Sequence, residues 1–299
     1  MKKIIDVFKR IRIYFTSKKK KRLNRGLMMD FVLFLSLTLF GLFSAFPLVY
    51  IASNAFKPLD ELFLFPPRLI VQNPTFQNFS DLLRVMGDSW VPFTRYIFNT
   101  VFYTLVGTAG HVIFAAMAAY PLAKYNFPGK TFIFSVVVLS LMFAKEVTVV
   151  PNYVTMSALG LVNTPFAIIF PAFGFALGLY LLKQFMEQVP MELIESARVD
   201  GAGEMRILFT IIIPMVKPAI LTLIIFSFQE LWEVVGGSFI YTEHWKTLSD
   251  AINSIVLGGV ARAGVAGAAT LIMISVPITL FIFTQNRIVE TMSSSGIKG

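Results

Sequence analysis

The chain has 299 residues, of which 56% are hydrophobic and only 14% are charged, and its formal net charge is +9. Soluble domains carry about 25% charged residues, so a water-soluble fold would have too little polar surface for this sequence. The composition therefore excludes an ordinary soluble globular protein and predicts a membrane protein.

The first 26 residues carry most of the net charge. They hold eleven Lys or Arg against one acid, Asp6. The basic run 18–22 stands just before an apolar segment, so anionic lipid at the cytoplasmic face is a better partner than nucleic acid. Apolar residues recur at helical spacing over 2–16, which predicts an N-terminal interfacial amphipathic helix, with a solvated basic tail as the alternative. We separate this cytoplasmic segment from a membrane domain at 27–299.

Six apolar segments follow, each long enough at ~1.5 Å per helical residue to cross a bilayer core of ~30 Å. Helices are favoured over strands because the apolar runs are continuous and lack alternation. The sequence therefore predicts an all-α, polytopic membrane protein with six transmembrane helices. The predicted spans are 30–53, 96–123, 131–157, 164–186, 215–240 and 266–287.

Lys and Arg are distributed unevenly between the loops. With the N-terminus inside, the inside segments carry nineteen of them and the outside segments six. This bias predicts a multi-pass protein of the cell membrane with both termini cytoplasmic. The outside loop 54–95 is rich in proline, and we expect one short helix in it near 79–86. The inside then holds the loop 187–214 and a short tail, 288–299.

The inside loop 187–214 has the pattern of two short helices. Pro190 suits the first helical position, and Glu192 suits the positive end of the helix dipole. Gly201 can adopt a positive φ and end the first helix, and a second helix is expected from Gly203 or Glu204 to Thr210. Leu193, Ile194 and Ala197 form an apolar stripe with one small residue, suited to a partner's cleft. The alternative is an ordinary amphipathic connector.

A spaced motif lies in this loop: Glu195-Ser196-Ala197, three residues, Gly201, nine residues, Ile211, one residue, Ile213-Pro214. It closely resembles the EAA motif of binding-protein-dependent ABC importer permeases, which is Glu-Ala-Ala, three residues, Gly, nine residues, Ile, one residue, Leu-Pro. The departures are Ser196 for Ala and Ile213 for Leu, both similar in size. All spacings hold over the motif.

The resemblance implies the transmembrane-domain fold of an ABC type I importer. It also implies three kinds of partner: a second permease subunit, an ATPase dimer that receives the coupling helices 190–210, and an extracytoplasmic solute-binding protein. The ATPase-coupling residues that it implies are Glu192, Glu195, Ser196, Ala197, Asp200, Gly201, Ala202, Pro214, Lys298 and Gly299.

Three further segments resemble the carbohydrate-type group of this family. They are residues 54–58 after the first span, Asn99-Thr100 in the second, and the ending 295–299. The ending is similar to the tail of the second permease in maltose-type transporters. The resemblance therefore implies half of a translocation pathway for a sugar or oligosaccharide. Permeases for non-sugar solutes share the central motif, so a non-sugar substrate stays open.

The sequence contains no complete nucleotide-binding motif. Gly129-Lys130-Thr131 mimics the end of a P-loop, but Lys124 stands where the upstream glycine belongs. ATP and Mg are therefore expected on a separate ATPase chain, and no cofactor is expected on this one. Two scattered histidines and no cysteine supply no metal or catalytic constellation, so we expect no enzyme activity.

Several polar residues fall inside the predicted spans, where a charge costs about 2.5–3.5 kcal/mol at mid-bilayer. Such residues usually face a cavity or a partner, and carboxylates beside an aromatic ring suit a hydroxyl-rich solute. Contacts between helices or with the second permease are the alternative. The candidates for a substrate path are Lys145, Glu146, Asn152, Gln229, Glu230, Trp232 and Glu233.

The sequence also predicts where the polar residues of the third span lie. Lys145 and Glu146 fall mid-way along the third span, and a break is expected at Asn152 and Tyr153. The charged residues also fit the ion relay of a stand-alone secondary transporter, but the sequence has no inverted repeat. His111, alone in the second span, is expected to pack and hydrogen-bond there.

Overall fold

The structure is a computed structural model that describes residues 27–87, 91–237, 239–259 and 262–295. The chain divides into two compact units, Met1–Tyr50 and Ile51–Gly299, and each is described by itself. The predicted amphipathic helix at 2–16 lies outside the described residues, as do Lys298 and Gly299.

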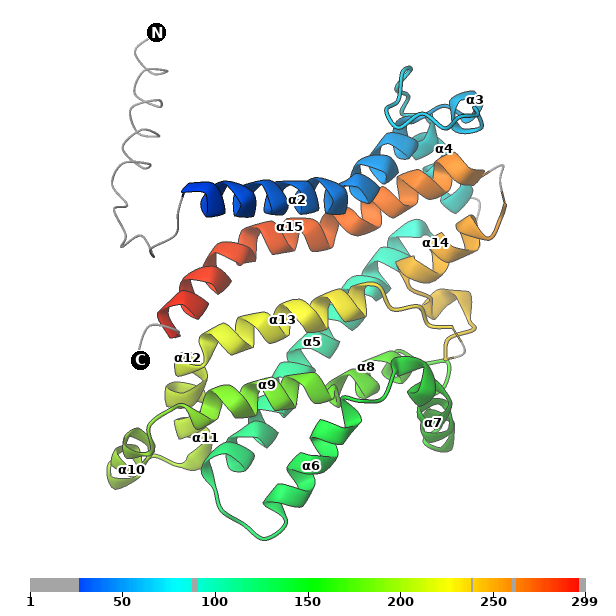
Figure 1. The fold of residues 1–299 in the computed structure, drawn as a ribbon. Helices are drawn as coiled ribbons and strands as arrows, with labels where there is room; N and C mark the ends of the chain where they lie inside the picture. The colour runs from blue at the N-terminus through cyan, green and yellow to red at the C-terminus, as the bar shows by residue number, and fades with distance from the viewer. Residues whose placement is uncertain (1–26, 88–90, 238, 260–261, 296–299) are drawn as a thin grey trace, which may run out of the picture. The chain divides into compact units, whose positions relative to one another are not determined.

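All regular secondary structure of the described residues is helical (Figure 1). The first described helix, α2 (Leu27–Phe56), belongs to the first unit up to Tyr50 and continues into the second. The other α-helices are α3 (Leu59–Leu62), α4 (Gln77–Gly87), α5 (Phe93–Lys124), α6 (Lys130–Ser140), α7 (Lys145–Ala158), α8 (Phe166–Phe173), α9 (Ala176–Glu187), α10 (Met191–Val199), α11 (Glu204–Ile207), α12 (Ile213–Met215), α13 (Lys217–Trp232), α14 (Leu248–Val256) and α15 (Ala263–Ser295). A π-helical turn (Leu208–Ile212) and a 3₁₀ turn (Glu243–Trp245) complete them.

Among the described residues, four helical stretches are long and apolar enough to cross a membrane. These are Met28–Phe56, Phe93–Lys124, Phe166–Glu187 and Ala263–Gln285. A fifth crossing requires Glu204–Met215 and Lys217–Trp232 to act as one span, although they are bent by 86° at Val216. The structure thus contains the several apolar helices that the sequence predicts, and a count of six spans stays a prediction.

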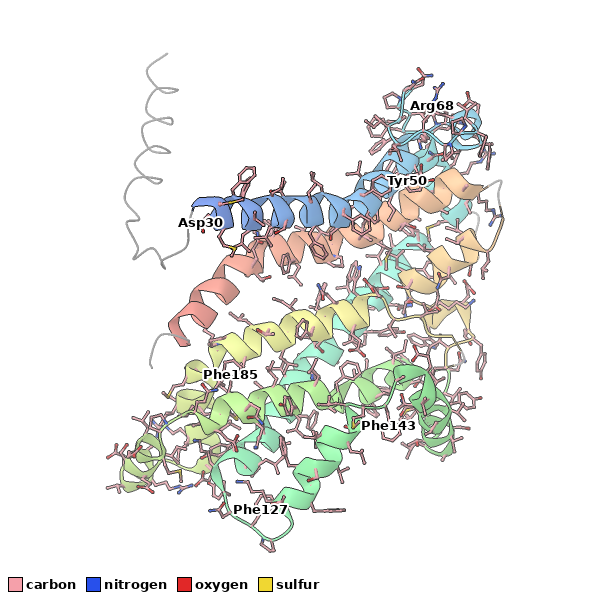
Figure 2. The ribbon with its side chains drawn as sticks, in the orientation of Figure 1. Asp30, Tyr50, Arg68, Phe127, Phe143 and Phe185 are labelled. Atoms are coloured by element: carbon pink, nitrogen blue, oxygen red, sulfur yellow. The ribbon has the colours of Figure 1, made fainter. Side chains whose placement is uncertain are left out.

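The expected third span is not one helix. It is divided into α6 and α7 by residues 141–144, and Figure 2 labels Phe143 at this corner. The break expected at Asn152 and Tyr153 is wrong, because both lie within α7. The apolar residues around the corner hide it from a hydropathy reading, whereas Glu146 marks it, since the first turn of a helix favours a carboxylate.

The helix expected over 215–240 is shorter than predicted. It begins at Lys217 after the bend and ends at Trp232, and two glycines follow it. Gly237 has a φ of +50°, and a Cβ on Gly236 would lie 2.8 Å from the Cβ of Ile240. The chain therefore turns tightly here and leaves the helix axis.

The second unit is organised around α5, which packs against α8, α9 and α13. One buried cluster joins the C-terminal half of α5 to α9, α13 and the 190–216 region, and a second joins α4, α14 and α15.

His111 of α5 is 1% exposed, and its Nδ1 lies 3.4 Å from the carbonyl oxygen of Phe173. Gly178 of α9 makes room for the ring, because a Cβ there would lie 2.1 Å from Nε2.

The proline-rich loop after α2 is held by buried polar residues. Lys57 donates to Asn54 Oδ1 (2.8 Å) and to the Arg68 carbonyl, and the amides of Gln72 and Asn73 donate to the Glu61 carboxylate. The short helix expected near 79–86 is confirmed as α4.

Candidate partner-docking site

The loop that carries the sequence motif folds into a compact unit that we call the 190–216 module: α10, α11, the π-helical turn and α12, ending at the bend. Gly201 ends α10 with a φ of +79°, as the sequence predicts. Its amide donates to the carbonyl of Arg198, and the amide of Ala202 donates to that of Ala197, both at 2.9 Å. This is a Schellman motif, which fixes the angle at which the chain leaves the helix.

One face of the module is buried in the chain's own core. Ile194 and Ile207 are fully buried and Leu208 is 1% exposed. They belong to the same cluster as Leu182 of α9 and Leu223 of α13. The module is therefore seated on the helix bundle by apolar packing, which fixes the orientation of α10.

The opposite face of the module is open. Val199 is 88% exposed and Leu193 is 41% exposed, on a helix of only nine residues. The expected apolar stripe is divided between the two faces, because Ile194 and Ala197 turn toward the chain's core while Leu193 turns outward. The exposed members of the predicted coupling set are Glu192, Glu195, Ser196, Asp200, Gly201 and Pro214, whereas Ala202 is partly buried.

A polar network joins the module to the C-terminal end of α5. Arg198 Nε and Glu204 Oε1 form an ion pair at 2.9 Å, and Tyr120 of α5 donates its hydroxyl to Glu204 Oε2 at 2.8 Å. Arg198 Nη2 donates to the hydroxyl of Tyr125 at 2.6 Å, and its guanidinium lies over that ring. Each charged side chain of the pair is thus hydrogen-bonded to a tyrosine from outside the module.

The electrostatics of this pair follow from its hydrogen bonds. Hydrogen bonds with Tyr125, Arg198 and Tyr120 lower the pKa of the Glu204 carboxyl below its ordinary value. The hydrogen bond that the Arg198 guanidinium donates to Glu204 in turn raises the pKa of Arg198. Each partner therefore keeps its charge over a wider pH range than it would in water.

Lys124, the last residue of α5, holds the start of the module. Its Nζ donates to the carbonyl oxygens of Glu187 (3.1 Å) and Val189, at the C-terminal end of α9. A cation is favourable there because the helix dipole leaves its negative end at those carbonyls. Sequence reasoning missed Tyr120, Lys124 and Tyr125. The only signal for them was two tyrosines and a lysine at the end of an apolar span.

Pro214 lies in α12, and the bend into α13 follows two residues later at Val216. Proline is tolerated at the start of a helix, so Pro214 fits the beginning of α12 and Pro218 that of α13.

The predicted substrate-path residues of α13 lie at its C-terminal end. Trp232 is 6% exposed, donates its indole N–H to the carbonyl of Met273 at 3.0 Å and stacks on Phe228. Its ring is therefore occupied by contacts within the chain. Gln229 and Glu230 are partly buried and Glu233 is exposed.

The other predicted path residues lie in a different helix, α7. Lys145 is the first residue of α7, and its side chain lies outside what the structure describes. Glu146 is exposed and Asn152 is partly buried. Lys145 and Glu146 stand at a helix start rather than mid-way along a continuous span, which corrects the position that the sequence indicated, whereas Asn152 lies in the middle of α7. No cluster of three His, Cys, Asp or Glu suited to a metal occurs among the described residues.

Comparison with known proteins agrees with this architecture. The family model "Binding-protein-dependent transport system inner membrane component" matches residues 111–292, which include the whole module. The trehalose transport system permease protein SugB of Mycobacterium tuberculosis is 30% identical over 263 residues, 86% of this chain and 93% of that protein. The galactooligosaccharides transport system permease protein GanQ of Bacillus subtilis is 26% identical over 271 residues, 89% of this chain and 94% of that protein.

The fold also matches a solved structure. A chain of a bacterial ABC transporter involved in the import of the acidic polysaccharide alginate superposes with a TM-score of 0.73 at 22% identity, covering 87% of this chain and 96% of that chain. The relatives are transport permease proteins rather than enzymes. The family match extends over more than half of the sequence, and the chain therefore belongs to the binding-protein-dependent transport system inner membrane components, as an ABC transporter permease of the membrane.

Proposed function

We propose that this chain forms half of the translocation pathway of an ATP-driven importer for a sugar or oligosaccharide. Its partners are a second permease subunit, two ATPase subunits that bind ATP and Mg, and an extracytoplasmic binding protein that delivers the solute. The relatives named for trehalose and galactooligosaccharides support a carbohydrate substrate. Both termini and the 190–216 module then lie in the cytoplasm, as the distribution of Lys and Arg favours.

The observation that carries the proposal is the construction of the module. One side is buried in the bundle by Ile194 and Ile207, and the other presents Val199 and Leu193 to the outside. A short helix that is fixed on one side and open on the other can seat in an ATPase subunit and move with it. The π-helical turn and the bend at Val216 connect that motion to α13.

Under this proposal, ATPase closure biases the permease between two states through its contact with α10. A ligand can shift such an equilibrium only by its difference in affinity for the two states. The angle between α10 and α11 must therefore be held while force is applied. The Schellman motif at Gly201 and the Arg198–Glu204 pair support that role.

The substrate path remains part of the proposal. Gln229, Glu230 and Glu233 at the end of α13 are acceptors that suit a hydroxyl-rich solute, together with Asn152, Lys145 and Glu146 of α7. Trp232 acts there through its contacts with Met273 and Phe228 rather than by stacking on the sugar. Lys298 and Gly299 remain proposed ATPase contacts.

The test is a pair of glycine substitutions in the assembled transporter, reconstituted in liposomes with its binding protein. Gly201→Val forces a β-branched residue to a φ of +79°, where an L-residue costs about 1–2 kcal/mol, or about a five- to thirtyfold change in a local equilibrium. We expect transport to fall by about that factor and to lose its coupling to ATP hydrolysis.

Gly203→Ala is the matched control. Gly203 lies two residues away at a φ of −72°, and a Cβ on either glycine would meet open space. Transport should therefore be retained in Gly203→Ala. Equal coupling in Gly201→Val, Gly203→Ala and the unmodified protein would contradict the proposed role of the module. A binding protein that binds no sugar in a ligand screen would contradict the proposed substrate class.

A further inference from the structure

Helix α5 is hydrogen-bonded at both of its ends to segments far away in the sequence. The inner end, defined by Tyr120 and Lys124, holds the 190–216 module, as described above. The other end holds residues 243–250, which comprise the 3₁₀ turn and the start of α14. In Figure 1, α5 passes through the second unit from the neighbourhood of α14 to that of α11.

Three buried residues of α5 hydrogen-bond to backbone groups of the 243–250 segment. Asn99 Nδ2 donates to the carbonyl oxygens of His244 (2.8 Å) and Lys246 (2.9 Å). Tyr103 donates its hydroxyl to the carbonyl of Trp245 at 2.9 Å. Thr100 Oγ1 accepts from the amide of Leu248 at 2.7 Å. The side chains thus satisfy four backbone groups within a stretch of five residues.

The segment itself is rigid where α5 holds it. Thr247 caps α14 in a capping box with Asp250, and the Asp250 carboxylate also accepts from the amide of Gly236 at 3.1 Å. Tyr96 of α5 donates to Glu243 at 2.8 Å, and Glu243 pairs with Lys246 at 2.6 Å. A rigid segment that is fixed to a helix must follow the helix when it moves.

The part of α5 between the two ends is continuous. From Thr100 to Tyr120 it is about 30 Å long at 1.5 Å per residue, and it contains no proline. Gly107 and Gly110 bring it close to its neighbours, since a Cβ there would meet Leu231 at 2.6 Å and Phe173 at 2.1 Å. Close packing along its length resists bending, because packed interiors transmit strain.

We propose that α5 is a connecting rod that fixes the 243–250 segment and the 190–216 module to each other, with Asn99, Thr100 and Tyr103 as positioning residues at one end and Tyr120 and Lys124 at the other. This inference rests on the proposed docking of the module on an ATPase. It adds that contacts made at the 243–250 segment act on the module about 30 Å away.

The experiment compares isosteric substitutions in the fully assembled transporter. Thr100→Val and Tyr103→Phe each remove one hydrogen bond to the 243–250 segment without changing side-chain shape. Thr104→Val is the matched control: Thr104 lies one turn further along α5, is fully buried, and its hydroxyl has no hydrogen-bond partner in the described part of the chain. Thr100→Ser keeps the hydroxyl and is the rescue variant.

The readout is the stimulation of ATP hydrolysis by the sugar-loaded binding protein, together with transport per ATP hydrolysed. We expect a severalfold loss of both in Thr100→Val and Tyr103→Phe, and values like those of the unmodified protein in Thr104→Val and Thr100→Ser. If Thr100→Val and Tyr103→Phe behave like Thr104→Val while Gly201→Val still uncouples transport, the rod is wrong and the proposed function stands. If Gly201→Val has no effect, the proposed function itself fails.

A distance measurement tests the rod without relying on those variants. The chain has no cysteine, so two can be introduced for spin labels at the exposed His244 of the 243–250 segment and at Met205 of the module (57% exposed). We expect one narrow distance that is the same in the nucleotide-free and the ATP-trapped transporter. A distance that differs between the two states overturns the proposal.

Discussion

The 190–216 module and the α6–α7 region illustrate two ways in which this chain uses apolar residues. In the module, Ile194, Ile207 and Ile212 are fully buried by the chain's own helices. In α6 no residue is buried, and in α7 the only buried residue among the described side chains is Met156. The module therefore takes its shape from this chain alone, whereas the apolar surface of α6 and α7 requires lipid or another subunit to cover it.

The largest expected effect tests the buried side of this comparison. Ile194→Ala should destabilise the module by about 2–5 kcal/mol, because it leaves a cavity in a packed core. Leu193→Ala, the neighbouring position on the same helix, should cost less than about 1 kcal/mol because Leu193 is already 41% exposed. Thermal unfolding of the purified protein in detergent, followed by proteolysis within the module, measures both.

The same measurement extends to α6. Phe132 is 73% exposed, so Phe132→Ala should leave the stability of the isolated chain unchanged. A loss for Phe132→Ala as large as that for Ile194→Ala would show that α6 is packed like the module, and the comparison would then fail.

A smaller effect is expected where the module meets α5. Tyr120→Phe removes the hydrogen bond to Glu204 and should cost about 1 kcal/mol, since Glu204 remains paired with Arg198. Tyr180→Phe is the control, because its hydroxyl makes no hydrogen bond within the described residues and its ring stacks on Phe134. Equal unfolding temperatures for the two variants would show that the polar network does not stabilise the module.

Sequence reasoning was strongest where local chemistry determines structure. Gly201 was predicted to end α10 because a left-handed position favours glycine, and the structure has a φ of +79° there. The short helix α4 was likewise predicted from local chemistry, because prolines restrict where the loop can be helical. The motif spacings identified the family, which the comparisons confirm.

Contacts between distant residues could not be read from the sequence. Tyr120 and Glu204 are 84 positions apart, and Asn99 and His244 are 145 apart, so no local pattern joins them. Hydropathy also conceals a corner that lies inside an apolar run, as at 141–144, because both sides of the corner are equally apolar. Residue burial on α10 was misjudged at Ala197, since a small residue suits a partner's cleft and the chain's own core equally well.

A third prediction tests whether Glu146 marks the start of a helix. A carboxylate in the first turn stabilises a helix by about 0.3–1 kcal/mol, so Glu146→Gln should lower stability by that amount. Glu233 caps the opposite, negative end of α13, so Glu233→Gln should be neutral or slightly stabilising. A loss of stability in Glu146→Gln without a loss in Glu233→Gln supports the break in the third apolar segment. An equal change in both variants would favour the continuous helix.

The smallest effect concerns the pH dependence of the module. The pKa of Glu204 is lowered, so its pairing contributes stability above its ordinary value of 4.5, and this contribution is lost as the pH falls through the lowered value. The carboxylate is 49% exposed, so solvent screens the pair and the effect is modest. Protease sensitivity of the module should be constant from pH 8 to about 5 and rise below the ordinary value of the carboxyl. Glu204→Gln should raise sensitivity at neutral pH and flatten the acid rise.

Glu243 also has a lowered pKa, with its burial opposing the effects of Lys246 and Tyr96, so cleavage must be scored at the module itself. An acid rise that is equally steep at the module in Glu204→Gln would mean that the pair does not hold α10 against α11.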